Sequence, residues 1–593
     1  MKSLFHLNKY FLRYKWHVIT GTFFVIISVI FEVFPATYVR ESFNIVENAI
    51  SNYREGDLSG MGALRNELIT YGLLIIGASL LQGLFMFFMR QTLIVMSRHI
   101  EYDLKNEVYQ HYQALNLAFY KRNNTGDLMN RISEDVSRVR MYIGPAIMYT
   151  IRTSALLIIV LTIMLQQNVQ LTLLTLIPLP LLAFAIYKIS EKINVRSTVV
   201  QEQLSVLSTF AQETFSGIRV LKSYSKEEKQ LADFAKEAEE YNQRNESLYR
   251  VNALFFPIIV LLIGLSTLLV IYFGGSLVIA QTISVGVIAE FIIYVNKLTW
   301  PVASLGWVTS IVQRAAASQT RINEFLLQEP EIKNHIHLDT DIRGKIEFDH
   351  VTFEYPDSGI VALKDLSFTV NPGETLAIVG KTGSGKSTVA ALVGRLYDPT
   401  EGVVKVDDKP LKETNLDALR NAMGVVPQEA FLFSDTLANN ISFGVDSATD
   451  QEVEEAARIA HVDANIQEFP KKYDTKVGER GVTLSGGQKQ RVSIARAVLA
   501  HPSILIFDDS LSAVDTETEE IILNNLKSVI DKRTTLIISH RASSVKNADK
   551  IIVLDDGALI ESGTHDELLK ANGYYKDLYE KQLMEEQQGD LSA

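Results

Sequence analysis

The sequence predicts a helical membrane domain followed by an α/β domain, and three observations support this order. Six long apolar runs lie before residue 327, and none follows it. From about residue 344, short and wholly apolar runs alternate with helical patterns. A glycine-rich loop stands between one such run and a helical pattern. We therefore predict a six-span α-helical transmembrane domain with long cytoplasmic helical extensions, followed by an α/β domain of the P-loop type.

The composition excludes several classes of protein. The chain has 593 residues, with 57 basic and 69 acidic side chains, and its formal net charge is −12. This acidic balance argues against a general nucleic-acid-binding role, so we expect no nucleic-acid partner. The chain contains no cysteine, which excludes a disulfide framework, a cysteine zinc site, an iron–sulfur cluster and a thiol nucleophile.

Each apolar run has about the 20 residues that a helix needs to cross a bilayer. Buried core helices of a soluble protein are the alternative, but six such runs in one stretch argue against them. A cleavable signal peptide would need a small-residue cleavage site, and Glu32, Pro35 and Arg40 stand there instead. The runs are His17–Tyr38, Leu68–Met89, Ile143–Leu165, Val169–Tyr187, Leu254–Ile279 and Val285–Val302.

Charge sets the orientation. Basic residues precede the first run, so we expect the N-terminus to be cytoplasmic. Ser3–Tyr14 mixes apolar and basic residues, as an interfacial elbow helix on the membrane surface does. The inner segments Arg90–Tyr142 and Lys188–Val251 are long and charged, and we predict two cytoplasmic helical hairpins. Their turns are expected at Asn123–Asp127 and at Ser216-Gly217.

Four ionisable residues lie in or near the spans: Glu32, Arg152, Glu290 and Lys297. Such groups are costly in hydrocarbon and usually face a cavity or a partner. Two interpretations stay open, a polar lining of a substrate pathway and a structural ion pair or interfacial position. Glu290 fits the interfacial position best.

The α/β domain begins with alternating strand patterns at Ile346–Phe348 and Val351–Tyr355. The runs Ala377–Val379, Ile504–Phe507 and Thr535–Ile538 are short and wholly apolar, as buried parallel strands are. Helical stretches lie between them. This alternation predicts an α/β domain of roughly 250 residues.

The glycine-rich loop fits G-x-x-x-x-G-K-[ST], and it lies between the Ala377–Val379 strand and a helical pattern at Thr388–Leu396. Glycines let backbone N–H groups close around phosphates, and the helix N-terminus adds positive potential. The lysine meets the phosphates, and the final hydroxyl ligates Mg²⁺. The loop reads Gly380-Lys381-Thr382-Gly383-Ser384-Gly385-Lys386-Ser387.

A second motif ends the Ile504–Phe507 run with Asp508. A buried strand that delivers a carboxylate at its C-terminal end suits the Walker B position. Asp508 is expected to hold Mg²⁺ through water. The two motifs together predict a P-loop nucleotidase that binds ATP and Mg²⁺.

Leu484-Ser485-Gly486-Gly487-Gln488, about 20 residues before Asp508, resembles the signature of ABC proteins. The remaining motifs match in order. Six spans fused to the N-terminal side of this domain resemble a half-transporter of the ABC multidrug/lipid exporter family. The other matches are Tyr355 with the adenine-stacking A-loop, Gln428 with the Q-loop, Val477–Gly481 with the X-loop, Ser512–Asp515 with the D-loop and His540 with the switch histidine.

The resemblance implies a dimer with another half-transporter. Two ABC nucleotide-binding domains pack head to tail, so that each ATP lies between the P-loop of one chain and the signature of the other. It also implies the binding residues Tyr355, Gly380 to Ser387 and Thr388 on one side, and Ser485, Gly486, Gly487 and Gln488 on the other. Asp508, Ser387 and Gln428 are the implied Mg²⁺ site, and Asp509, His540 and Gln428 the catalytic group. The hairpin tips are expected to dock on the nucleotide-binding domains.

One residue departs from the family pattern. The position after Walker B usually holds Glu, and here it is Asp509. Its carboxylate would sit about 1 Å short, and misplacement on this scale costs about 10²-fold in rate. The combination resembles the chain that carries the weak ATP site of a heterodimer, and we favour that interpretation. A homodimer with a slower but competent aspartate is the alternative.

The leading functional hypothesis is ATP-driven export or leaflet flipping of an amphipathic compound or lipid. Import by an exporter-type fold stays open, whereas soluble ABC proteins lack membrane spans. Membrane lipid is an expected partner, and we expect a bacterial plasma (inner) membrane with the nucleotide-binding domain in the cytoplasm. The predicted divisions are an elbow at 1–16, a transmembrane domain at 17–326, a linker at 327–343, an ABC nucleotide-binding domain at 344–580 and a polar tail at 581–593.

Overall fold

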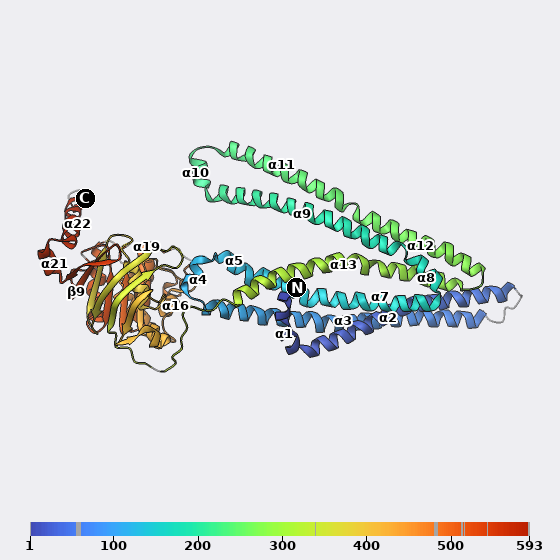
Figure 1. Cartoon of the computed structure of the whole chain (residues 1–593), viewed down its shortest axis with the longest axis horizontal. Helices are drawn as coiled ribbons and strands as arrows, with labels where there is room; N and C mark the ends of the chain where they lie inside the picture. Colours follow the sequence, from blue (N-terminus) through green and yellow to red (C-terminus); the bar gives the residue numbers. More distant parts are fainter. Residues whose placement is uncertain are drawn as a thin grey trace. The chain divides into compact units, whose positions relative to one another are not determined.

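The computed structural model describes residues 2–54, 61–338, 340–478, 484–510, 514, 516–542 and 544–590. The chain divides into two compact units. The first comprises Met1–Gln113 and Gly126–Gln328, and the second comprises Ala114–Thr125 and Glu329–Ala593. Figure 1 shows helices throughout the first unit and strands only in the second. The predicted fold class is confirmed.

In the described part of the first unit, six helical segments are long and apolar enough to cross a membrane. Each contains one of the six predicted apolar runs, and several continue well beyond it, as the predicted cytoplasmic extensions require. The segments are Lys15–Ser51, Gly62–Ala114, Thr125–Gln167, Val169–Ser216, Glu227–Ile279 and Val285–Leu326.

These segments are built from helices with short breaks between them. Pro178 begins α9 because proline fits the first turn, where its missing N–H costs no bond. The N-terminal part consists of the 3-10 helix η1 (Lys2–Leu7), α1 (Asn8–Arg13), α2 (Lys15–Arg54), α3 (Met61–Ala114), α4 (Leu117–Arg122) and α5 (Thr125–Asn130). Then follow the π-helical turn η2 (Arg131–Asp135), α6 (Val136–Met141), the π-helical turn η3 (Tyr142–Ala146), α7 (Ile147–Gln167) and α8 (Val169–Leu176). The last helices are α9 (Pro178–Ser216), α10 (Ile218–Ser223), α11 (Glu227–Asn252), α12 (Phe255–Ile279) and α13 (Val285–Leu326).

The predicted hairpin turns are observed with one difference. Gly217 separates α9 from α10, and α9 and α11 lie side by side behind this tip (Figure 1). At the other tip Asn123 has an extended backbone after α4. However, α5 already begins at Thr125, so the turn is shorter than the predicted Asn123–Asp127.

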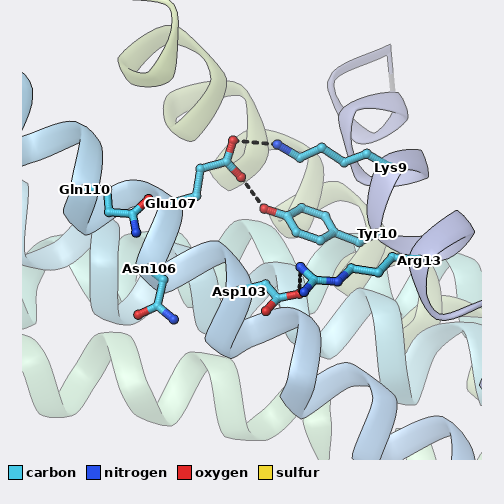
Figure 2. A pocket seen from close by; sticks show the side chains of 7 residues that line it. All are labelled: Lys9, Tyr10, Arg13, Asp103, Asn106, Glu107 and Gln110. Atoms are coloured by element: carbon cyan, nitrogen blue, oxygen red, sulfur yellow. Dashed lines mark hydrogen bonds and ion pairs between the residues drawn. The ribbon is translucent and has the colours of Figure 1, made fainter.

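The N-terminal segment packs against the long helix α3. Lys9 and Tyr10 both contact the carboxylate of Glu107, and Arg13 Nη1 lies 2.9 Å from Asp103 Oδ2 (Figure 2). These side chains line a polar pocket of about 400 Å³. The apolar side chains Phe5, Leu12 and Trp16 are exposed, as the predicted interfacial elbow would have them.

The core of the membrane bundle joins α2, α7, α8, α12 and α13. Gly286 allows the close approach of α13 to α2, because a Cβ there would lie 2.2 Å from the Arg40 carbonyl oxygen. Nearby, Glu290 is fully buried and its Oε2 lies 3.1 Å from Arg40 Nη1. Glu290 is therefore paired with Arg40 inside the protein, which agrees with the structural ion-pair interpretation. Its interfacial position stays a prediction.

The second unit contains two sheets. The four-stranded antiparallel sheet has the order β2-β1-β4-β5, with β1 (Ile346–Glu354), β2 (Val361–Val370), β4 (Glu401–Val406) and β5 (Lys409–Pro410). The six-stranded sheet has the order β10-β9-β3-β8-β7-β6, in which β9, β3, β8, β7 and β6 are parallel. Its strands are β3 (Thr375–Gly380), β6 (Met423–Val426), β7 (Ile504–Asp508), β8 (Thr534–Ile538), β9 (Lys550–Asp555) and β10 (Ala558–Gly563).

Apolar residues cover both faces of the six-stranded sheet. Along β3, Ala377 and Val379 pack in one core, whereas Leu376 and Ile378 pack in the other. The three predicted buried strands are confirmed as β3, β7 and β8. The two predicted strands near residue 350 are one strand, β1, with a register shift between Phe348 and Val351.

Helices of the second unit surround these sheets. The longer ones are α14 (Lys386–Val393), α17 (Asp450–Ile459), α19 (Gly486–Leu499), α20 (Thr516–Ile530) and α22 (Tyr574–Asp590). The short ones are η4 (Leu411–Glu413), α15 (Leu416–Asn421), α16 (Leu437–Ser442), α18 (Asp463–Gln467), η5 (Lys472–Asp474) and α21 (His565–Ala571).

Candidate functional site

Four adjacent parallel strands bring the predicted nucleotide-site residues to one edge of the sheet. The strands β3, β8, β7 and β6 are neighbours, so their carboxyl ends meet there. The P-loop leaves β3, Asp508 ends β7, and Gln428 and His540 each follow two residues after β6 and β8. The carboxyl edge of such a sheet is the usual place for a ligand.

The P-loop requires glycine where it turns into α14. Gly385 has φ +96°, and a Cβ at this residue would lie 2.2 Å from the Ala362 carbonyl oxygen. The helix begins at Lys386 and ends at Val393, before Gly394, so it starts and stops earlier than the predicted Thr388–Leu396. Its first N–H groups have no intrahelical acceptor and are available to an anion.

Lys386 is folded back over the loop. Its side chain is 5% exposed, and Nζ donates to the carbonyl oxygens of Gly380, at 2.9 Å, and Lys381, at 2.8 Å. Burial lowers the pKa of Lys386 to about 8, against the opposing pull of the Asp509 and Asp508 carboxylates. The ammonium is therefore poorly solvated by water. Phosphate oxygens would supply the negative charge that stabilises it.

The oxygen atoms that would hold Mg²⁺ lie together beside this lysine. Ser387 Oγ donates to Asp508 Oδ1 at 2.8 Å. Burial raises the pKa of Asp508, although the Ser387 bond opposes that shift. Among the described residues no group of three or more His, Asp or Glu is placed to hold a metal ion. Mg²⁺ often binds one or two protein oxygens together with substrate phosphates, and Ser387 Oγ and Asp508 Oδ1 fit that pattern.

Asp509 occupies a constrained position beside the predicted Mg²⁺ ligands. It is 9% exposed and has φ +46°, and its N–H donates to the Ile538 carbonyl oxygen at 2.8 Å. Gln428 Nε2 lies 3.4 Å from Asp509 Oδ2. The structure thus places two of the predicted catalytic residues in contact.

Ser384 Oγ is buried in the P-loop without a hydrogen-bond partner, which suits a loop shaped for a further polar ligand.

The predicted signature forms the start of α19. Ser485 Oγ accepts a bond from the Gln488 N–H at 3.2 Å, and Gln488 Oε1 accepts one from the Ser485 N–H at 2.9 Å. This capping box commits the Gln488 side chain to the helix start. Ser485 and Gly486 are exposed, so their outer surface is open to a ligand or another chain.

Comparison with known proteins identifies both units. Residues 18–302 match the model of the ABC transporter transmembrane region, and residues 363–512 match that of the ABC transporter domain. Multidrug resistance-like ATP-binding protein MdlA of Escherichia coli is 39% identical over 84% of each chain. The probable multidrug resistance ABC transporter ATP-binding/permease protein YheI of Bacillus subtilis is 36% identical over 97% of each chain.

The chain belongs to the ABC transporter family. It is an exporter-type half-transporter, in which one membrane region is fused to one ATP-binding domain. It is therefore an integral membrane protein and an ATP hydrolase coupled to transport, and it assembles with a second half-transporter. These conclusions confirm the family and the activity that the sequence predicted.

The tip at Ala114–Thr125 lies in the same unit as the ABC transporter's ATP-binding domain. Ala118 is fully buried in a core shared with that domain. Lys121 Nζ lies 5.0 Å from the ring centre of Tyr355, the predicted adenine platform, and Tyr355 Oη lies 3.0 Å from Thr388 Oγ1. The sequence carries no signal for Lys121 at this site, because only the folded chain brings it to Tyr355.

Some predicted motif residues lie outside the described residues. These are Glu479, Arg480 and Gly481 of the X-loop, and Ser512, Ala513 and Asp515 of the D-loop.

The low pKa of Lys386 predicts a pH dependence of ATP binding. Below about pH 8 the ammonium is present, and as the pH rises further the free protein loses the charge that is predicted to meet the phosphates. Between pH 8 and 9.5 the Kd for ATP should rise by up to about tenfold per pH unit, measured by titration calorimetry. Lys386→Arg should bind more weakly but with a flat profile, because arginine stays protonated. A flat wild-type profile to pH 9.5 would contradict this role.

Proposed function

We propose that this half-transporter uses ATP to export, or flip between leaflets, an amphipathic compound or lipid. The observation that supports this proposal best is the arrangement of the predicted ATP-site residues. The P-loop, Asp508 and Asp509 gather at one sheet edge, whereas the signature at Ser485 stays exposed at the start of α19. Relatives of similar length are named for multidrug resistance, which supports export of amphipathic compounds.

In the proposed site each group has a separate role. The P-loop N–H groups and Lys386 hold the phosphates, and Tyr355 supports the adenine. Ser387, Asp508 and Gln428 would hold Mg²⁺, and the bound ion would supply positive charge that offsets the charge of the phosphates. Asp509 orients the attacking water, with His540 contributing from the end of β8. The partner's signature closes the other side of the nucleotide.

The two hairpin tips support a dimer in which the halves exchange contacts. One tip packs on the chain's own ATP-binding domain through Ala118. The other tip leaves Phe215, Val220 and Tyr224 exposed, by 73%, 62% and 71%. Such a cluster of exposed apolar side chains suits a protein interface. We therefore assign this second tip to the ATP-binding domain of the partner.

Asp509 supports a heterodimer. A carboxylate one methylene short of the usual glutamate gives this chain a weak site, while its intact signature completes a stronger site on the partner. A homodimer with slow turnover is the competing proposal. The bacterial relatives support a bacterial plasma membrane, with the ATP-binding domain in the cytoplasm.

The proposed export is tested in inside-out membrane vesicles that contain the chain with its natural partner. Fluorescent amphipathic probes of negative, neutral and positive charge are added outside with Mg²⁺ and ATP. Uptake of at least one probe that depends on ATP hydrolysis supports export. Release of preloaded probe instead of uptake would indicate an importer, and no ATP-dependent movement of any probe or labelled lipid would refute transport of amphiphiles.

A further inference from the structure

Three membrane spans bring together one carboxylate and two cations. Glu32 is on α2, Arg152 on α7 and Lys297 on α13. Arg152 Nη2 lies 2.8 Å from Glu32 Oε2, and Lys297 Nζ lies 3.9 Å from Glu32 Oε1. With all three groups ionised, the cluster has a formal charge of +1.

Glu290 is already committed elsewhere, so it does not balance this charge. Its carboxylate is fully buried and accepts hydrogen bonds from Arg40 at 3.1 Å, Tyr294 at 2.9 Å and Thr37 at 3.2 Å. Arg40 also pairs with Glu41 at 2.6 Å. The positive charge therefore belongs to the cluster of Glu32, Arg152 and Lys297.

The three side chains of the cluster are partly exposed at the protein surface. Exposed fractions of the side chains are 12% for Glu32, 24% for Arg152 and 25% for Lys297. Each residue falls within an apolar run, where lipid contact is costly for a charge. α13 is the most buried span, with 53% of its most apolar stretch buried against 11–33% for the others. The cluster therefore faces the interior of the bundle or a polar cavity.

Each cation has an aromatic residue one helical turn away along its own helix. Tyr149 precedes Arg152 by one turn of α7, and its ring lies 5.4 Å from that of Trp307 on α13. Trp300, one turn beyond Lys297, is 65% exposed, and Trp307 is 42% exposed. These rings offer an apolar surface on the same two helices as the cationic groups, which suits a compound with one charged end.

We infer that this cluster is a substrate site that selects amphipathic compounds bearing a carboxylate or phosphate group. The anionic end lies between Arg152 and Lys297, and the apolar body lies against Trp300, Trp307 and Tyr149. An unbalanced cation is unfavourable in a low-dielectric environment, and an anionic ligand removes that penalty. The same charge repels cationic amphiphiles. The inference rests on the proposed export function and names its substrate class.

The test uses the inside-out vesicles and three probes that share one ring system. The probes carry a carboxylate, the corresponding neutral amide and a quaternary ammonium. The wild type should take up the carboxylate in preference to the ammonium. Lys297→Gln should weaken the apparent affinity for the carboxylate by at least about tenfold, without weakening that for the amide. Glu32→Gln should strengthen carboxylate binding. Lys188→Gln, which alters an exposed lysine of α9, is the matched control and should change no ratio.

A second arm separates the two sources of an anionic group. Acyl-labelled phosphatidylglycerol is placed in the same membranes, and its ATP-dependent flipping is measured by dithionite quenching. Flipping without carboxylate uptake assigns the site to lipid phosphates, and uptake without flipping assigns it to small carboxylates. Either result supports the inference if Lys297→Gln lowers the rate of the flipping or uptake that is observed.

Some results would overturn the anionic substrate site without contradicting the proposed export. Preferred uptake of the ammonium by the wild type would overturn it and leave export intact, even if the variants do not assemble. An unchanged carboxylate-to-amide ratio in Lys297→Gln would also overturn it. If no probe or lipid moves with ATP, the proposed export itself fails.

Discussion

Replacing Lys386 by alanine should lower ATP hydrolysis and transport by at least about a hundredfold. Nζ of this lysine is buried against two P-loop carbonyl oxygens, where phosphate oxygens would take over its contacts. Alanine removes the cation from the centre of the loop. Membrane insertion and yield should be retained, because the six spans lie in the other unit.

The measurement is the ATPase rate of the purified full-length assembly, alongside ATP-dependent probe uptake. Lys412→Ala provides the matched control, since this exposed lysine lies in η4 and its Nζ is 3.9 Å from Asp398 Oδ2. An ATPase rate in Lys386→Ala equal to that of the control would remove the P-loop assignment.

Asp509 should distinguish the two possible dimers. If this chain carries the weak site of a heterodimer, it hydrolyses ATP poorly when purified alone, and its partner raises the rate sharply. In that complex Asp509→Asn should change the rate by less than about twofold. Ser485→Arg should lower it by about a hundredfold, because the exposed signature of this chain would complete the partner's site.

A homodimer gives the opposite pattern. The chain alone is active, Asp509→Asn abolishes the activity, and Asp509→Glu raises it by restoring the missing methylene. Steady-state ATPase rates of the chain alone, with Asp, Asn and Glu at position 509, separate the two cases. Robust activity that is lost in the Asn variant would exclude the weak-site interpretation.

The parts of the fold that the sequence predicts well are those imposed by one strong physical demand. Hydrocarbon requires long apolar helices, so the six runs appear as spans. A sheet buried on both faces requires continuous apolar strands, so β3, β7 and β8 could be found from their residues alone. The P-loop and the Walker B aspartate can also be predicted from the sequence, because each motif lies at the end of a single strand.

Other features depend on contacts between distant residues, and a single sequence carries no signal for them. The shift at His350, where φ is +51°, joins two strand patterns into β1. The pairing of Glu290 with Arg40 cannot be predicted from the sequence, because the two residues are 250 positions apart. The placement of Lys121 over Tyr355 depends in the same way on how the first hairpin tip packs.

The central claim is that ATP lies between the P-loop of one half and the signature of the other. The chain has no cysteine, so single cysteines at Ser485 and at Thr382 can each be labelled with a small maleimide in the membrane-bound assembly. With a non-hydrolysable ATP analogue and Mg²⁺, labelling should slow at both positions. The protection at both positions should vanish when the P-loop lysine is replaced by alanine in both halves, at Lys386 in this chain and at the equivalent lysine in the other half. Protection at Thr382→Cys with unchanged labelling at Ser485→Cys would contradict the claim, because the nucleotide would then occupy the P-loop without reaching the signature.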